Sequence, residues 1–309
     1  MHHNVPGWAW IVFACVFGVL LTVDLLAHRF GRRESRSRTL FWSLLWIGAG
    51  LGFGAFVWAI TDARTAEEYF GVYVLEKSLS LDNLFVFLLV FTSLKIPERH
   101  QRTGLSWGIF GALTFRAILI FAGVRIVERW AWTEYVFAAF LFYAAWHAFR
   151  EDPLAQKENR IIKWLSKRLP VSEKTDTSKF VVRESGVRKA TPVLVAVVAI
   201  ECSDFIFAVD SVTVALSLTR NEFLIYTANA FAILGLRALY MLLAKTIAGL
   251  RYLHYGLAAI LAFAGLKMVL GEQVDVPPLV SVGIVAACMG ISAWFSVRRG
   301  APADSERAA

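Results

Sequence analysis

Long apolar runs, separated by short polar segments, dominate the chain. A helix that crosses the hydrocarbon core of a bilayer needs about 20 mostly apolar residues. Pro192 opens the sixth run and Pro277-Pro278 opens the ninth, as expected where a proline occupies the first helical turn. The pattern predicts an all-α membrane protein with about nine transmembrane helices, at roughly 8–27, 39–60, 69–93, 104–123, 133–150, 192–217, 222–244, 252–270 and 277–297.

The composition agrees with a lipid environment. Hydrophobic residues make up 57% of the chain, charged residues 18%, and the mean hydropathy is +0.56, whereas a soluble domain carries about 25% charged residues. Of the 32 lysines and arginines, 24 fall in segments on one side of the predicted membrane and four on the other. This bias predicts an outside N-terminus and a cytoplasmic C-terminus. It also accounts for the net charge of +8 without nucleic acid as a partner.

The spans divide the chain into five segments. Residues 1–38 hold the first helix and a basic cytoplasmic loop, 39–150 hold helices two to five, and 192–270 hold helices six to eight. Residues 271–309 hold the last helix and a cytoplasmic tail. Between them, 151–191 is a basic cytoplasmic segment, in which 161–168 fits either an amphipathic helix on the inner leaflet or a solvated linker helix.

Two stretches of the chain share a pattern. An acid, five residues, an aspartate and a small polar residue occur at Glu76–Asn83 and again at Asp204–Ser211. One helix later, Arg116 and Arg237 each follow an apolar residue and precede an alanine. Spans three to five (from about 69) and six to eight therefore resemble two copies of one three-helix unit. Because three is odd, the copies would cross the membrane in opposite orientations, as an inverted repeat typical of secondary transporters. The alternative is chance similarity, because the spacing from aspartate to arginine differs between the copies.

Five carboxylates fall inside the predicted spans: Glu76, Asp82, Glu201, Asp204 and Asp210. A carboxylate at the membrane centre costs about 2.5–3.5 kcal/mol on insertion scales. Protons can neutralise some of them, and Arg116 and Arg237 can each pair with one or two. The remaining charge suits a divalent cation, and Asn83 and Ser211 would complete an oxygen site for Mn²⁺, Mg²⁺ or Ca²⁺.

The spacing of these acids suggests irregular helices. Glu76 and Asp82 lie about 240° apart around an ideal helix, and Glu201 and Asp210 about 180° apart. We therefore predict that both helices unwind near the acids, so that backbone carbonyls join the site. Lys77 is a candidate local counter-ion for Glu76. Asp24, near the inner end of the first span, fits either the cytoplasmic mouth of a pathway or a helix end at the interface.

The Ser-Leu-Asp-Asn and Phe-Ala-Val-Asp-Ser stretches, within Glu76–Asn83 and Glu201–Ser211, resemble the TerC family of membrane proteins. Asp24 is similar to an aspartate in the first helix of its Alx-like branch. The resemblance covers roughly 8–297 and implies a fold similar to that of LysE-type exporters. It also implies export of Mn²⁺, in exchange for protons, along the five acids. Thr213 stands where many members have proline.

We therefore expect a multi-pass inner (plasma) membrane transporter, an antiporter for divalent metal ions with Mn²⁺ as the transported ion, and not an enzyme. HExxH, a Ser-His-Asp set and a phosphate loop are absent from the sequence. The alternative is a tellurium-resistance factor that acts as a membrane scaffold or as a metal-loading helper for exported proteins. Nothing in the pattern predicts the oligomeric state.

Overall fold

The computed structural model describes residues 5–28, 36–130, 132–150, 170–172, 177, 179–184, 186–236, 239–241, 252–270 and 276–299. Within these residues, a helix occupies each of the predicted ranges. The helices are α1 (Trp8–His28), α2 (Arg36–Ile60), α3 (Ala63–Ser93), α4 (Glu98–Arg129), α5 (Thr133–Arg150), α7 (Pro192–Leu218), α8 (Glu222–Leu234), α10 (Leu253–Leu270) and α11 (Pro278–Arg299).

Several of these helices could cross a membrane by length and composition. A search of the described residues finds five candidates of sufficient length and hydropathy: Thr39–Ile60, Thr103–Arg129, Pro192–Leu218, Glu222–Met241 and Leu279–Ser296. Trp8–Val23 and His254–Leu270 are shorter apolar helices. Large apolar side chains such as Ile11, Trp58 and Tyr143 are exposed along the helices, as expected of surfaces that face lipid. The chain is therefore a helical membrane protein, and nine spans remain a prediction.

The predicted unwinding of the two acidic helices is wrong. α3 runs as an unbroken α-helix from Ala63 to Ser93, and α7 from Pro192 to Leu218. Thr213, where a proline would remove a backbone donor, instead donates its hydroxyl to the carbonyl of Val209 at 2.7 Å and stays within the helix. Carbonyls of α3 and α7 are thus committed to helical hydrogen bonds.

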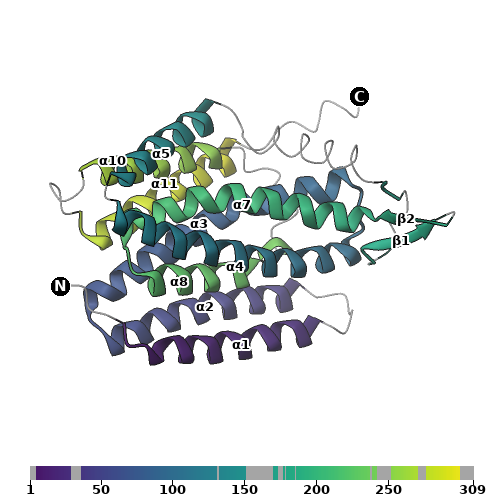
Figure 1. Ribbon diagram of the computed structural model, residues 1–309, viewed down its shortest axis with the longest axis horizontal. Helices are drawn as coiled ribbons and strands as arrows, with labels where there is room; N and C mark the ends of the chain where they lie inside the picture. Colours follow the sequence, from purple (N-terminus) through teal and green to yellow (C-terminus); the bar gives the residue numbers. More distant parts are fainter. Residues whose placement is uncertain are drawn as a thin grey trace.

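A small hairpin departs from the all-α prediction. Strands β1 (Val181–Glu184) and β2 (Val187–Ala190) pair in antiparallel register, Val181 opposite Ala190. Gly186 adopts a φ of +81° in the turn, a conformation that favours glycine. The hairpin lies at one end of the molecule and leads directly into α7 (Figure 1). The predicted helix or linker at 161–168 lies outside the described residues.

The helices run along the long axis in three groups (Figure 1). α1 and α2 flank one side, α5, α10 and α11 the other, and α3, α4, α7 and α8 form the middle. Within the middle group α3 packs against α8 and α4 against α7, while α5 packs against α10. If spans three to five are matched in order with spans six to eight, α3 corresponds to α7 and α4 corresponds to α8. The contact of α3 with α8 then corresponds to the contact of α7 with α4. The inverted repeat stays a prediction, and this packing is compatible with it.

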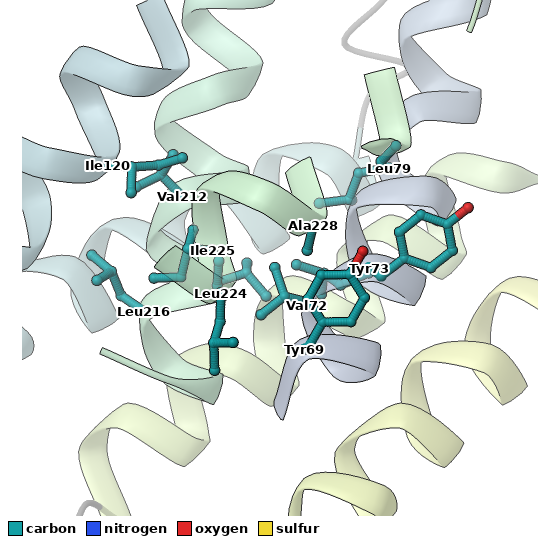
Figure 2. Close-up of a cluster of buried hydrophobic side chains, with 14 of the residues drawn as sticks. Tyr69, Val72, Tyr73, Leu79, Ile120, Val212, Leu216, Leu224, Ile225 and Ala228 are labelled. Atoms are coloured by element: carbon teal, nitrogen blue, oxygen red, sulfur yellow. The ribbon is translucent and has the colours of Figure 1, made fainter. Parts of the chain in front are cut away.

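Two apolar clusters fill the interior of the middle group. The larger one, which we call the first cluster, includes Val72, Leu79, Val212 and Leu224, and Figure 2 shows a portion of it. The second cluster includes Leu84, Phe91, Val195, Ile200 and Tyr240. Along α7 the second cluster ends at Ile200 and the first begins at Val212. The polar residues of α7, among them Glu201, Asp204 and Ser211, fall in the stretch between these two buried positions.

Candidate functional site

An arginine and two carboxylates from three helices meet inside the bundle. Arg116 on α4 donates from Nη1 to Glu76 Oε2 on α3 at 2.5 Å and from Nη2 to Asp204 Oδ1 on α7 at 3.3 Å. Nη1 also donates to the hydroxyl of Ser211 on α7 at 3.4 Å. The exposed fractions are 1% for Glu76, 2% for Arg116 and 4% for Asp204. The prediction that Arg116 pairs with one or two carboxylates is confirmed, and it pairs with two.

Glu201 completes this group, one helical turn before Asp204 on α7. Its two carboxylate oxygens are buried and have no hydrogen-bond partner among the described residues. A Cβ atom at Gly111 of α4 would overlap the carboxylate of Glu201. The missing side chain of Gly111 is thus what lets the carboxylate enter the interface of α4 and α7. We call Glu76, Arg116, Glu201, Asp204 and Ser211 the polar layer.

Replacing Gly111 by alanine should displace the Glu201 carboxylate without unfolding the protein. The added methyl group meets the end of a flexible side chain, so the carboxylate can swing aside at a small cost. If Glu201 acts in transport, Gly111→Ala should lower the rate about tenfold or more while the melting temperature changes by only a few degrees. Gly52→Ala is the matched control, since the space around that glycine is open. Equal transport in both variants would show that the location of Glu201 does not matter.

Lys77 does not serve as the counter-ion of its neighbour Glu76. Its Nζ instead donates to the carbonyl of Ala232 on α8 at 3.1 Å. α8 ends two residues later, and a Cβ atom at Gly235 would lie 2.8 Å from the ammonium group. The sequence-based expectation for Lys77 was therefore wrong. The ammonium group binds a carbonyl near the end of α8, next to a glycine that leaves it room.

For most of the other predicted site residues the structure gives a position along a helix but no side chain, and one of them lies outside the described residues. Asp210 is half-buried on α7, between Asp204 and Ser211 of the polar layer. Asp82 and Asn83 belong to α3, in the stretch between Leu79 of the first cluster and Leu84 of the second; their side chains are not described. The same holds for the side chain of Asp24 on α1, and Arg237 lies outside the described residues.

The charges of the polar layer do not balance. Three ionised carboxylates and one guanidinium leave a formal charge of −2, which matches that of a divalent cation. Among the residues that the structure describes, however, no group of three or more His, Cys, Asp or Glu side chains is arranged to hold a metal ion. Arg116 occupies the space between Glu76 and Asp204. The layer is thus a set of carboxylates, two of which are bridged by an arginine.

Two residues that the sequence analysis passed over bear on this site. One is Gly111, whose role depends on a side chain of another helix and has no local sequence signal. The other is Asn229 on α8, fully buried, with neither amide atom in a hydrogen bond within the described residues. A signal for it existed, because it is the one amide in the apolar run 223–236.

Comparison with known proteins places this architecture in a family. The chain is 37% identical to an uncharacterized membrane protein of Myxococcus xanthus, over 93% of this chain and 91% of that protein. It is 36% identical to Alx of Escherichia coli K12, named as a proposed membrane-bound redox modulator, over 94% and 95% of the two chains. No solved structure matches. Residues 61–301 match the integral membrane protein TerC family, and the chain belongs to this family.

Proposed function

We propose that this protein exports a divalent cation, Mn²⁺ first among the candidates, across the inner membrane in exchange for protons. The observation that carries the proposal is the polar layer: three buried carboxylates with one arginine, enclosed by apolar clusters inside a membrane protein. Buried charges in membrane proteins are rare and mark ion pathways. Oxygen ligands of this kind suit Mn²⁺, Mg²⁺ and Ca²⁺, and the resemblance to the Alx-like branch favours Mn²⁺ among them.

Arg116 acts in this proposal as a resident counter-ion. In the described conformation it bridges Glu76 and Asp204, so these carboxylates are stabilised while no cargo is bound. An arriving cation must draw at least one carboxylate away from Arg116, with Glu201 as its first ligand. Glu201 fits that role because no described group competes for its oxygens. Protonation of the carboxylates from the outer side would then release the cation and restore the arginine pairs.

Apolar side chains enclose the polar layer in this conformation. Residues of the first cluster lie on both sides of Glu76 along α3 and of Arg116 along α4, and on α7 the second cluster precedes Glu201. With the N-terminus outside, Val212 of the first cluster lies on the outer side of the layer along α7, and Ile200 of the second cluster lies on the inner side. Transport by alternating access requires that only one of the clusters opens at a time. The packing of Val72, Val212 and Leu224 in the first cluster (Figure 2) supports an assignment of this conformation to an occluded state of the proposed cycle.

The experiment that tests the function measures cell manganese after a Mn²⁺ load. Cells that express the wild type should hold less manganese than cells with empty vector. Asp82→Asn should return manganese to the empty-vector level, because Asp82 lies on α3 in the stretch between the clusters. Glu134→Gln is the matched control: Glu134 lies in the first turn of α5, outside the layer, and pairs with Arg220. It should export like the wild type.

Other outcomes separate the rival functions. If the wild type lowers no metal in the cell, and Asp82→Asn still restores tellurite resistance, the protein acts as a scaffold and the exporter proposal is wrong. If the wild type leaves total manganese unchanged but raises the metal content of exported proteins in a manner that Asp82→Asn abolishes, the same carboxylates serve metal loading instead.

A further inference from the structure

Asn229 is a buried amide that the fold leaves without a partner. Its exposed fraction is 0%, and within the described residues neither Nδ2 nor Oδ1 forms a hydrogen bond. A buried amide without hydrogen bonds destabilises a fold. Asparagine is also a weaker helix former than the leucine or alanine residues around it. Packing and stability therefore do not explain this residue at the middle of α8.

Contacts between α4 and α8 fix the level of Asn229 in the bundle. The ring of Phe121 lies 5.9 Å from that of Tyr226, and Arg125 Nε lies 3.9 Å from Glu222 Oε1. The higher-numbered residue of α4, Arg125, is therefore next to the lower-numbered residue of α8, Glu222. The two helices are antiparallel. Asn229, three residues beyond Tyr226, therefore lies opposite the turn of α4 that carries Arg116.

The orientation of the amide follows from its neighbours on α8. Phe231 contacts the rings of Phe13 and Phe53 on α1 and α2. Two residues correspond to about 200° around a helix, so Asn229 projects away from α1 and α2. Ile225, one turn earlier on nearly the same face, lies toward Val212 of α7 (Figure 2). Asn229 thus points away from α1 and α2, into the interior of the middle group, at the level of the polar layer.

We propose that Asn229 is a further ligand of the transported cation, which it binds through Oδ1. This inference rests on the proposed function and adds α8 to the helices that supply the site. A neutral amide oxygen is a regular ligand of Mg²⁺, Ca²⁺ and Mn²⁺ and adds coordination without adding negative charge. The formal charge of the polar layer would already match a divalent ion, so a neutral ligand is the kind that the site can still accept.

The test compares Mn²⁺ binding to purified wild-type protein and to Asn229→Leu. Leucine has nearly the shape of asparagine and removes the unpartnered amide. Without metal, the variant should melt at the temperature of the wild type or above it. With Mn²⁺ alone as the probe, the wild type should be stabilised, since a ligand that binds only the folded state raises its stability. The variant should bind about tenfold or more weakly and show a smaller shift.

Thr227→Val is the matched control. Thr227 is a buried polar residue on α8, but its hydroxyl donates within the helix, to the carbonyl of Phe223 at 2.6 Å, and it lies on the opposite face from Asn229. This variant should keep the full Mn²⁺-induced shift. Asn229→Ala provides a second test should leucine fail to fit, and it too should bind Mn²⁺ weakly.

The outcomes distinguish this inference from the function on which it rests. Equal Mn²⁺-induced shifts in the wild type, Asn229→Leu and Asn229→Ala would overturn the ligand role and leave the exporter proposal standing. A melting temperature without metal that falls sharply in both Asn229 variants, with unchanged Mn²⁺ affinity, would show a structural role and also overturn it. A wild type that binds no divalent cation would overturn the proposed function and this inference together.

Discussion

Glu201→Gln should leave the protein as stable as the wild type, or more stable, while cation export falls to the background level. Both carboxylate oxygens of Glu201 are buried and have no hydrogen-bond partner among the described residues. A buried group in that state costs about 1–3 kcal/mol, more when it is charged. Glutamine keeps the shape and removes the charge. Gains in stability upon losing a functional group are a known sign that the group was retained for activity.

Two measurements check this prediction. The first is the melting temperature of the purified protein without metal, followed by tryptophan fluorescence, which should not fall. The second is manganese efflux from loaded cells, where Glu201→Gln should resemble empty vector. Glu134→Gln again serves as the control and should keep efflux. A variant that exports at the wild-type rate would remove Glu201 from the cation path, and one that melts far below the wild type would show that the carboxylate supports the fold.

The sequence predicted the helices well because their boundaries are encoded locally. α5 begins at Thr133 and ends at Arg150, as predicted, and α7 begins at Pro192 and ends one residue beyond its predicted end. Apolar runs of fixed length bounded by prolines and charges determine such limits. α8 ends at Leu234, where Gly235 forms a turn, but helical residues follow at 236 and 239–241, and the predicted end at 244 lies outside the described residues. The hairpin of β1 and β2 was missed, because two four-residue strands in a basic segment carry little hydrophobic pattern.

The error about unwound helices has an instructive cause. The spacing argument assumed that the acids of one helix must all point toward one site. In the structure the acids that meet come from different helices: Glu76 of α3 and Asp204 of α7 both pair with Arg116 of α4. On α7, Glu201 and Asp204 are three residues apart and so share a face. Which helices become neighbours depends on tertiary packing, and neither composition nor periodicity contains that information.

The same reason limits what the sequence could say about the site. The predicted acids and Arg116 were found because charges inside apolar runs are conspicuous. Gly111 was not, because its importance depends on the Glu201 side chain that fills its place. The partner of Lys77 was also beyond reach, since Ala232 lies 155 residues away in the chain. Local sequence identifies the charged groups, and packing decides which of them meet.

Removing Arg116 should destabilise the protein more than any other single change in the polar layer. Arg116→Met leaves Glu76 and Asp204 buried without the guanidinium that now binds them. Loss of one partner from a buried ion pair costs about 3–5 kcal/mol, because the remaining charge is uncompensated. The expected measurement is a fall of this size in the free energy of unfolding, from titration with a denaturing detergent. Arg220→Met, which breaks the more exposed pair with Glu134, should cost about 0–1 kcal/mol.

A triple variant separates the charge effect from simple loss of packing. When Glu76→Gln and Asp204→Asn accompany Arg116→Met, all three charges disappear together, and replacement of a whole buried ion pair is often neutral or stabilising. We therefore expect the triple variant to recover most of the stability that Arg116→Met loses, while it stays inactive in export. If the triple variant is as unstable as the single one, Arg116 supports the fold through its packing. If Arg116→Met alone is as stable as the wild type, a counter-ion is not needed in the resting state, and the proposed exchange between Arg116 and an arriving cation would lose its basis.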